Sequence, residues 1–377
     1  MEQNKEGLTL AEVKRRKRKR KRIKRTLIGL GGVVALCLCV VTGFFVVRAR
    51  GEKSLKENVQ DDTNREGYIT YNGKKYHYKD DMVNILCLGI DIRQENLDEW
   101  AQEDMEAEQD EPEEENGDSG KKESTGKGKG RRSGQADAIF ILALDTKEHT
   151  LDVIAVPRDI MVPVKKYSIA GEYIGTENLQ ITLQHAYGDG KQQSCELMEE
   201  AVSNLFYQLP INGYCSINML ALPIINDAVG GVEVHMNEDL TLLNPEFTEE
   251  SDVLLQGDAA MDFVGGRDIT MAQSSLARIG RQKEYLMSFV PAAKSAVKSD
   301  MTLPIEIYQT LSEYMVTDIS ADEVTYLASE AVKCDFSEDS LHIVDVDVQM
   351  GEKYEEYYVK EEELYQMIID IFYEEVK

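Results

Sequence analysis

Twenty-two consecutive residues without a charge, from Thr26 to Val47, constrain this chain more than any other part of its sequence. A helix of this length reaches about 33 Å, which is enough to cross a hydrocarbon core of about 30 Å. The segment 14–25 before it, KRRKRKRKRIKR, is densely basic, whereas basic residues after it are sparse. Because basic flanks stay on the cytoplasmic side, we expect a single-pass protein of the cell membrane, with residues 1–25 in the cytoplasm and residues 48–377 extracellular.

Charge is strongly segregated along the chain. Residues 1–25 contain 12 Lys and Arg against three Glu, and the other 352 residues contain 30 basic against 66 acidic side chains. Nucleic-acid binding depends on a clustered positive surface, so the acidic composition of residues 26–377 argues against this function. Only the short tail 1–25 could supply such a surface. Next to a membrane span, such a tail is better explained as a topology determinant that also touches anionic lipid, and we expect no DNA-reading element.

The exported part divides into a stalk with a hairpin and one large domain. Residues 48–79 begin with a polar stretch without apolar period, typical of a stalk, and end with the strong hairpin signal Asn72-Gly73. Residues 80–377 form the domain. Within it, the insert 94–134 has 13 acidic and no basic residues at 94–118, followed by a Gly-, Ser- and Lys-rich run at 119–134, and we expect it to be disordered because it cannot bury a core.

Strand and helix patterns alternate through the domain. Short apolar runs predict strands at 83–90, 138–144, 151–157, 214–219, 232–236 and 341–348, the second and third pairing as a hairpin. Periodicity predicts helices at 178–187, 192–209, 270–298 and 360–375, the third interrupted at Pro291. The capping box Ser320–Glu323 predicts the start of a further helix. This order predicts an α/β fold with a mixed central sheet sandwiched by helices.

Four cysteines lie in the exported part, at 87, 195, 215 and 334. None has the spacing of a zinc site. Cys195 and Cys215 could form a disulfide, and free, buried thiols are an equal alternative.

Charged residues gather at the ends of the predicted strands. Asp91 and Arg93 follow one strand, Asp137 precedes the next, and Arg158-Asp159 follow the third. If these strands are neighbours, their tips lie on one rim of the sheet, where ligands of α/β proteins bind. Two carboxylates there would repel each other unless a hard cation lay between them.

Arginines supply a complementary charge. Arg278 and Arg281 are three residues apart and face the same side of one predicted helix. With Arg158 and Arg267 they would form an array of guanidinium groups suited to diphosphate oxygens. The alternative for each is a solvated charge or a surface ion pair, and spacing does not decide between these interpretations.

Several motifs follow one another in the order found in one family of envelope proteins. They are NILCLGIDIR (84–93), DAIFILALD with LDVIAVPRD (137–159), LQHAYGDG (183–190), INDAVGGVEV (225–234) and RIGRQ (278–282). By these motifs the chain resembles the LytR-CpsA-Psr (LCP) family of Gram-positive bacteria over about residues 80–300. Members of that family transfer anionic glycopolymers, such as teichoic acids and capsule polymers, from a polyprenyl diphosphate carrier to peptidoglycan with magnesium.

The resemblance implies roles for particular residues. Asp91 and Asp137 would be ligands of Mg²⁺. The expected substrate-binding residues are Arg93, Arg158, Arg267, Arg278, Arg281 and Gln282. The expected catalytic residues are Arg158, Asp159 and Arg281, and Asp91 and Asp159 are candidates for the base that activates the attacking hydroxyl.

Three positions depart from the family pattern. Gln135 and Gly265 stand where arginines are usual, and Ser275 stands where an Asp is frequent. The first hypothesis remains a Mg²⁺-dependent phosphotransferase that links a glycopolymer to a peptidoglycan hydroxyl through a phosphodiester. The alternative, favoured by Gln135 and Gly265, is a non-catalytic scaffold or attenuator of envelope biogenesis that binds polyprenyl phosphates or wall polymer, because two cationic contacts to phosphate are missing.

Overall fold

The computed structural model describes residues 42–57, 68–91, 133–168, 171–266, 274–352 and 354–376. Its centre is a six-stranded sheet in the order β11 (Met315–Thr317), β8 (Gly213–Asn218), β3 (Met82–Asp91), β4 (Gln135–Asp145), β5 (Thr150–Ala155) and β12 (Leu341–Ile343). The pairs β3/β8 and β5/β12 are parallel and the other three are antiparallel. The predicted mixed central sheet and the predicted hairpin of β4 and β5 are therefore confirmed.

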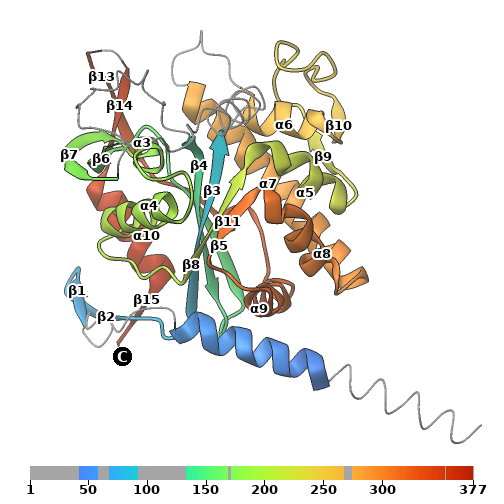
Figure 1. Ribbon diagram of the computed structural model, residues 1–377, viewed down its shortest axis with the longest axis horizontal. Helices are drawn as coiled ribbons and strands as arrows, with labels where there is room; N and C mark the ends of the chain where they lie inside the picture. The colour runs from blue at the N-terminus through green and yellow to red at the C-terminus, as the bar shows by residue number, and fades with distance from the viewer. Residues whose placement is uncertain are drawn as a thin grey trace, which may run out of the picture. The chain divides into compact units, whose positions relative to one another are not determined.

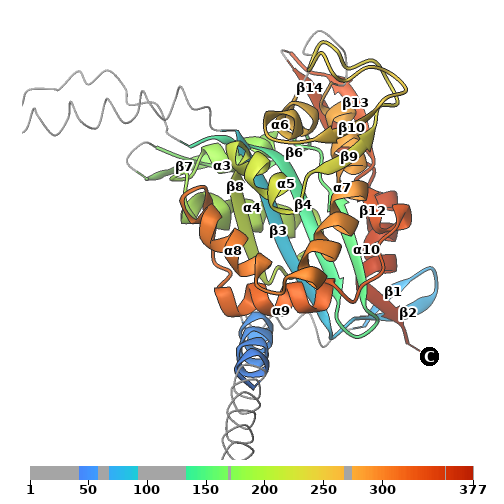
Figure 2. The same ribbon diagram turned by 90° about the vertical axis from the view of Figure 1, so that its right-hand side faces the viewer.

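Helices cover both faces of this sheet (Figures 1 and 2). One face carries α3 (Thr182–Ala186), α4 (Gln192–Leu205) and α10 (Glu361–Phe372). The other carries α5 (Leu222–Ala228), α6 (Asp258–Gly265), α7 (Ser274–Ser299), α8 (Leu303–Thr310) and α9 (Ala321–Ala331). We call these the α4 face and the α7 face.

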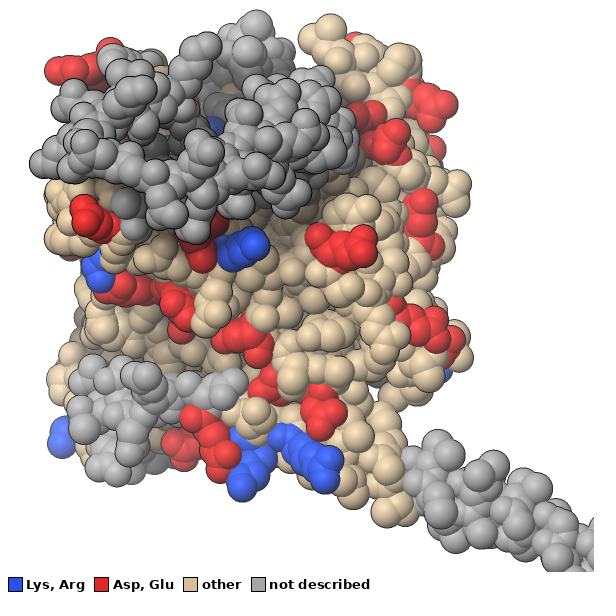
Figure 3. Space-filling model, viewed as in Figure 1, with Lys and Arg blue, Asp and Glu red and all other residues tan. Residues whose placement is uncertain are grey.

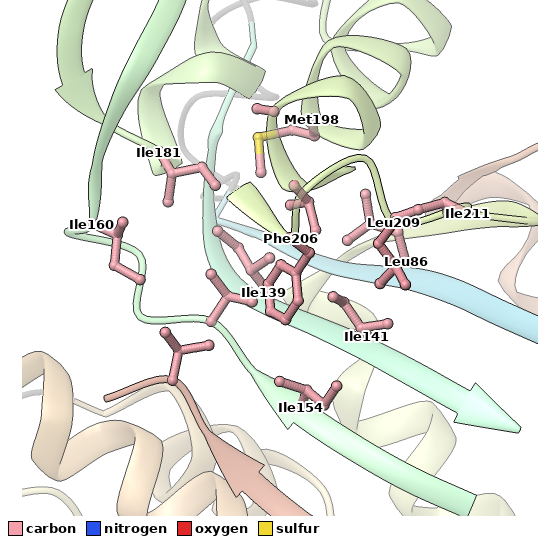
Figure 4. Close-up of a cluster of buried hydrophobic side chains, with 14 of the residues drawn as sticks. Leu86, Ile139, Ile141, Ile154, Ile160, Ile181, Met198, Phe206, Leu209 and Ile211 are labelled. Carbon is pink, nitrogen blue, oxygen red and sulfur yellow. The ribbon is translucent and has the colours of Figure 1, made fainter. Parts of the chain in front are cut away.

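The main hydrophobic core lies on the α4 face. Successive side chains of a strand point to opposite faces, so the alternate residues Leu86 of β3 and Ile139 and Ile141 of β4 point to this side. They pack against Met198 and Phe206 from the α4 region, as Figure 4 shows. Burying side chains of this size contributes about 1.5 to 3 kcal/mol each, and it fixes which residues of each strand remain for the α7 face.

Four smaller sheets lie around the centre. They are β1 (Ile69–Tyr71) with β2 (Lys74–Tyr78) and β15 (Tyr373–Glu375), β6 (Met161–Tyr167) with β7 (Tyr173–Gln180), β9 (Val232–His235) with β10 (Asp252–Leu255), and β13 (Val346–Met350) with β14 (Glu355–Val359). The predicted hairpin turn is confirmed, because Asn72 and Gly73 have φ angles of 48° and 78°, as a two-residue hairpin loop of this type requires.

Four predictions of local structure were wrong. Residues 178–180 belong to strand β7, because their backbone pairs with β6, and the helix there is only α3. The predicted strand 341–348 is divided between β12 and β13. The last helix ends at Phe372, since Tyr373 pairs with Tyr78 of β2. Pro291 lies inside α7 without interrupting it.

The predicted stalk was also wrong in part. Residues 42–57 are helical, and residues 51–57 belong to the main unit of the protein. Leu55 is fully buried, and its carbonyl oxygen accepts a hydrogen bond of 3.0 Å from Asn212. A buried side chain with a paired backbone group indicates packing on the domain, not a solvated tether.

Other predictions concern residues outside the described ranges. The cytoplasmic tail 1–25, most of the span 26–47 and nearly all of the insert 94–134 lie there. Among the helices that are described, none combines the length and the apolar character needed to cross a membrane. Acidic side chains are spread over the described surface drawn in Figure 3, in keeping with the net charge of −27.

Candidate functional site: an arginine–aspartate pocket beside an apolar cavity

A β-bulge aims Asp137 at the α7 face. Gly89 of β3 pairs with Ala138 and Ile90 pairs with Ala136, so Asp137 is an extra residue in β4. Ala136 packs in the core of the α4 face, whereas Asp137 and Ala138 line the same small pocket against α7. Regular alternation would have turned Asp137 away from Ala138, and the bulge therefore decides which face receives the carboxylate.

Two arginines hold this carboxylate. Arg278 of α7 donates from one terminal nitrogen to Asp137 Oδ2 and from the other to the Asp137 carbonyl oxygen, both at 3.0 Å. Arg158, which follows β5, donates to Asp137 Oδ1. The side chains are 4%, 15% and 11% exposed for Arg278, Arg158 and Asp137. Such buried ion pairs depend on each other, because removing one partner leaves an uncompensated charge out of water.

Asp159 adds a second carboxylate. Its Oδ1 lies 3.6 Å from Arg158 Nε, and its residue is 5% exposed. Within the described ranges Arg158 Nε makes no hydrogen bond, so this contact is an ion pair without directed hydrogen bonding. The polar residues that line the pocket are Asp137, Arg158, Ser275, Arg278 and Gln282. Asp159 lies beside Arg158, and together with the lining residues it gives the site two negative and two positive charges. We call this site the arginine–aspartate pocket.

Arg281 and Gln282 bind the end of a neighbouring helix. Arg281 Nε donates to the Phe263 carbonyl oxygen at 3.1 Å, and its terminal nitrogen donates to the Gly266 carbonyl oxygen. Gln282 Nε2 donates to the Val264 carbonyl oxygen at 3.3 Å. The last carbonyls of a helix lack intrahelical partners and carry partial negative charge, so these side chains stabilise the end of α6. Burial lowers the pKa of Arg281.

The structure thus brings some predicted site residues together and separates others. Arg158, Asp159, Arg278 and Asp137 meet as ion pairs, whereas the sequence had left open whether these charges would gather at one site or pair separately. Asp91 ends β3 in an exposed position, with its backbone opposite Gln135. Arg93 and Arg267 lie outside the described residues.

The site offers few oxygen ligands to Mg²⁺. Asp137 and Asp91 offer carboxylate oxygens from adjacent strands, but arginines hold both oxygens of Asp137, and the described residues contain no cluster of three or more His, Cys, Asp or Glu. Mg²⁺ in proteins commonly takes only one or two carboxylates and completes its shell with water and substrate phosphate. A magnesium ion could bind Asp137 only together with a phosphate group that takes the place of its carboxylate at Arg158 and Arg278.

Two apolar cavities lie on the α7 face, and one of them adjoins the pocket. Cavity A, of about 290 Å³, shares Ala138, Phe140 and Gln282 with the lining of the arginine–aspartate pocket. Cavity B, of about 320 Å³, shares Cys87, Leu142 and Cys215 with cavity A and continues toward α8 and α9. Charged groups and apolar space therefore follow one another along the sheet, an arrangement that suits an anionic group attached to a long apolar chain.

Fold and site together define a mixed α/β protein whose charged pocket adjoins an apolar cavity. The profile of the LytR_cpsA_psr family matches residues 43–371, and the chain belongs to this family.

Sequence relatives include two teichoic acid transferases. The chain is 23% identical over 206 residues to the polyisoprenyl-teichoic acid–peptidoglycan teichoic acid transferase TagU of Bacillus cereus, covering 55% of this chain and 62% of that protein. It is 27% identical over 197 residues to TagU of Halalkalibacterium halodurans, covering 52% of this chain and 59% of that protein. The match spans less than two thirds of the length of either relative.

Solved structures share the fold. TagT bound to LI-WTA superimposes with a TM-score of 0.52 at 18% identity, covering 77% of this chain and 89% of that chain. TagV of B. subtilis superimposes with a TM-score of 0.50 at 18% identity, covering 78% of this chain and 97% of that chain. At these identities the likeness concerns the fold.

Sequence reasoning missed the bulge, the binding of the α6 end by Arg281, and the contribution of α8 and α9 to cavity B. The small residues Gly89 and Ala138 at paired positions were the available signal for close approach at the bulge. No sequence pattern indicated the other two features.

Proposed function

We propose that this protein transfers an anionic wall glycopolymer from a polyprenyl diphosphate carrier to a hydroxyl group of peptidoglycan, with Mg²⁺. The observation that carries the proposal is the shared lining of the arginine–aspartate pocket and cavity A, at Ala138, Phe140 and Gln282. The diphosphate would bind the guanidinium groups while the prenyl chain occupies cavities A and B. Family membership and the names of the TagU relatives point to the same class of substrate.

The chemistry follows from the charges of the pocket. A sugar hydroxyl of peptidoglycan attacks the carrier-distal phosphorus, a phosphodiester forms, and polyprenyl phosphate leaves. Arg158 and Arg278 bind the phosphate oxygens in place of the Asp137 carboxylate and stabilise the charge that develops on them. Asp159, buried beside Arg158, orients that guanidinium and is a candidate to accept the hydroxyl proton, as is Asp91.

Other expected site residues take supporting roles in this proposal. Mg²⁺, held by Asp137 and Asp91 with phosphate oxygens, would supply Lewis-acid stabilisation of the transferred group. Arg281 and Gln282 fix the end of α6 beside the pocket, and Arg93 and Arg267 are proposed to contribute positive charge for binding the substrate phosphates. The membrane span 26–47 would keep the domain at the outer surface of the cell membrane, where the carrier lies.

A second candidate function is binding without transfer. Both carboxylate oxygens of Asp137 are engaged by arginines, and Gln135 and Gly265 supply no cation for a phosphate. A protein of this kind would hold the prenyl carrier or wall polymer and act as a scaffold or attenuator of envelope biogenesis. Turnover, not affinity, separates the two functions.

The test uses the full chain with Mg²⁺, a lipid-linked glycopolymer and peptidoglycan fragments, and measures the phosphodiester product. We expect transfer that is lost in Arg278→Ala and retained in Lys298→Ala, which removes an exposed cation from the far end of the same helix α7. Tight carrier binding without product would establish the second function. Absence of both binding and product would overturn the proposal.

A variant of the cavity tests the position of the prenyl chain. Leu142 lines both cavities, so Leu142→Phe should narrow the path between them. We expect weaker binding of a prenyl diphosphate and unchanged binding of inorganic pyrophosphate. Equal binding of the prenyl diphosphate by the variant and the unmodified chain would place the prenyl chain elsewhere.

A further inference from the structure

Three sulfur-bearing side chains meet where cavities A and B join. Cys87 of β3 lies directly opposite Cys215 of the parallel strand β8, and both line the two cavities. Met315 belongs to β11 on the other side of β8 and lines cavity B. The register pairs Cys215 with Thr317, so Met315 is the diagonal neighbour of Cys215 on the same face.

The sulfur atoms of Cys215 and Met315 are close, and neither Cys215 nor Cys87 is in a disulfide. Cys215 Sγ lies 3.4 Å from Met315 Sδ, and both cysteines are free thiols. Burial raises the pKa of Cys215 to about 12 and that of Cys87 further. The thiols therefore stay protonated and unreactive unless a ligand replaces their protons.

Cys87 and Cys215 are free thiols and form no disulfide with each other. A metal ion suits side chains on neighbouring strands about 4.8 Å apart, because two metal–sulfur bonds of about 2.3 Å hold their sulfur atoms roughly 4 Å apart. The surrounding lining of both cavities is apolar and, next to the three sulfur atoms, supplies no carboxylate or imidazole.

We propose that Cys87, Cys215 and Met315 form a binding site for a soft monovalent metal ion, with Cu(I) as the biological ion of this class. Thiolate and thioether sulfur prefer Cu(I) over hard cations such as Mg²⁺. Binding exchanges a proton for the metal: a thiol S–H bond breaks, a sulfur–copper bond forms and the proton leaves to solvent, with no change in oxidation state. The site is separate from the arginine–aspartate pocket, which offers oxygen ligands only.

The test uses the full chain with Cys37→Ser and Cys39→Ser, so that the four cysteines of the exported part remain. The reduced protein is titrated with Cu(I) under nitrogen against the chelator bicinchoninate. We expect one Cu(I) per chain and, by X-ray absorption at the copper edge, a shell of sulfur atoms. Cys215→Ser and Cys87→Ala should each weaken binding more than about 100-fold, beyond the 10- to 100-fold typical of losing an outer-shell partner.

A matched control separates this site from other thiols. Cys195 is also a free, buried cysteine, but it packs in the core of the α4 face. Cys195→Ser should leave the Cu(I) affinity unchanged. Met315→Leu should lower the Cu(I) affinity, while its circular dichroism spectrum remains that of the unmodified chain. Equal losses in the Cys195 and Cys215 variants, or a copper shell without sulfur, would overturn the proposal.

One consequence rests on the proposed function. The sulfur atoms lie between the two cavities, so a bound ion would obstruct a prenyl chain that passes from cavity A to cavity B. We expect one equivalent of Cu(I) to abolish binding of a long prenyl diphosphate and to spare inorganic pyrophosphate. If copper binds through sulfur and prenyl diphosphate binding is unchanged, the metal site stands and the proposed route of the prenyl chain is wrong.

Discussion

Replacing Asp137 tests the charge balance of the pocket most directly. The carboxylate is 11% exposed and pairs with Arg158 and Arg278, so Asp137→Ala leaves two largely buried guanidinium groups without their shared partner. Removing one member of a buried ion pair typically costs about 3 to 5 kcal/mol. Arg278 also binds the backbone of residue 137, and Arg158 keeps Asp159 at 3.6 Å, so we expect about 3 kcal/mol, near the lower limit.

The assay is thermal unfolding of the full chain, followed by circular dichroism. A loss of about 3 kcal/mol corresponds to a fall in Tm of roughly 6 to 10 °C for a domain of this size. Glu200→Gln is the control, since it breaks an ion pair with Lys165 whose side chains are 40% and 47% exposed, and exposed pairs contribute at most about 1 kcal/mol.

Inorganic pyrophosphate provides a second readout. In Asp137→Asn the two guanidinium groups lose their shared anion and only Asp159 remains beside Arg158, so pyrophosphate without Mg²⁺ should raise the Tm of this variant more than that of the unmodified chain. A loss of stability below about 0.5 kcal/mol in Asp137→Ala, within the range of ordinary surface substitutions, would refute the idea of a shared buried charge. So would a larger pyrophosphate response in the unmodified chain.

Three further predictions concern stability. Burial raises the pKa of Glu199 to about 7, so the contribution of this group to stability is fully present below its usual pKa and is lost as pH rises through 7. Discounted for partial exposure, this loss is roughly 1 to 2 kcal/mol, and Glu199→Gln should flatten the dependence of unfolding free energy on pH. Gly51→Ala would place a Cβ 2.2 Å from the Asp322 carbonyl oxygen, so we expect it to lower the free energy of unfolding in urea by about 1 to 3 kcal/mol. The control Gly280→Ala in α7 places a Cβ that meets nothing within 4 Å and should raise the free energy of unfolding by about 0.5 to 1 kcal/mol. Equal effects of the two substitutions would contradict the packing of residues 51–57. Ser320→Ala removes the cap of α9 and should lower the free energy of unfolding by about 1 kcal/mol. An unchanged Tm would mean that the cap does not stabilise the helix.

Local signals predicted the parts of the fold that depend on neighbouring residues. The Asn72-Gly73 turn, the hairpin of β4 and β5 and the capping box at Ser320 all formed as expected. Each depends on residues close together in the sequence, so propensity and spacing are sufficient to predict it. Strand β15 illustrates the opposite case, because its helical pattern is overridden by pairing with β2, almost 300 residues earlier.

By itself, the sequence determined the alternation of strands and helices, the segregation of charge and the presence of acidic and basic residues at strand ends. Only the tertiary structure decided what those residues do. The bulge turned Asp137 toward Arg278, packing against α6 directed Arg281 to helix carbonyls, and three separate strands brought Cys87, Cys215 and Met315 together. The physical reason is that a side chain's partners depend on long-range strand register and helix packing, and one extra residue in a strand is enough to change the face on which a charge lies.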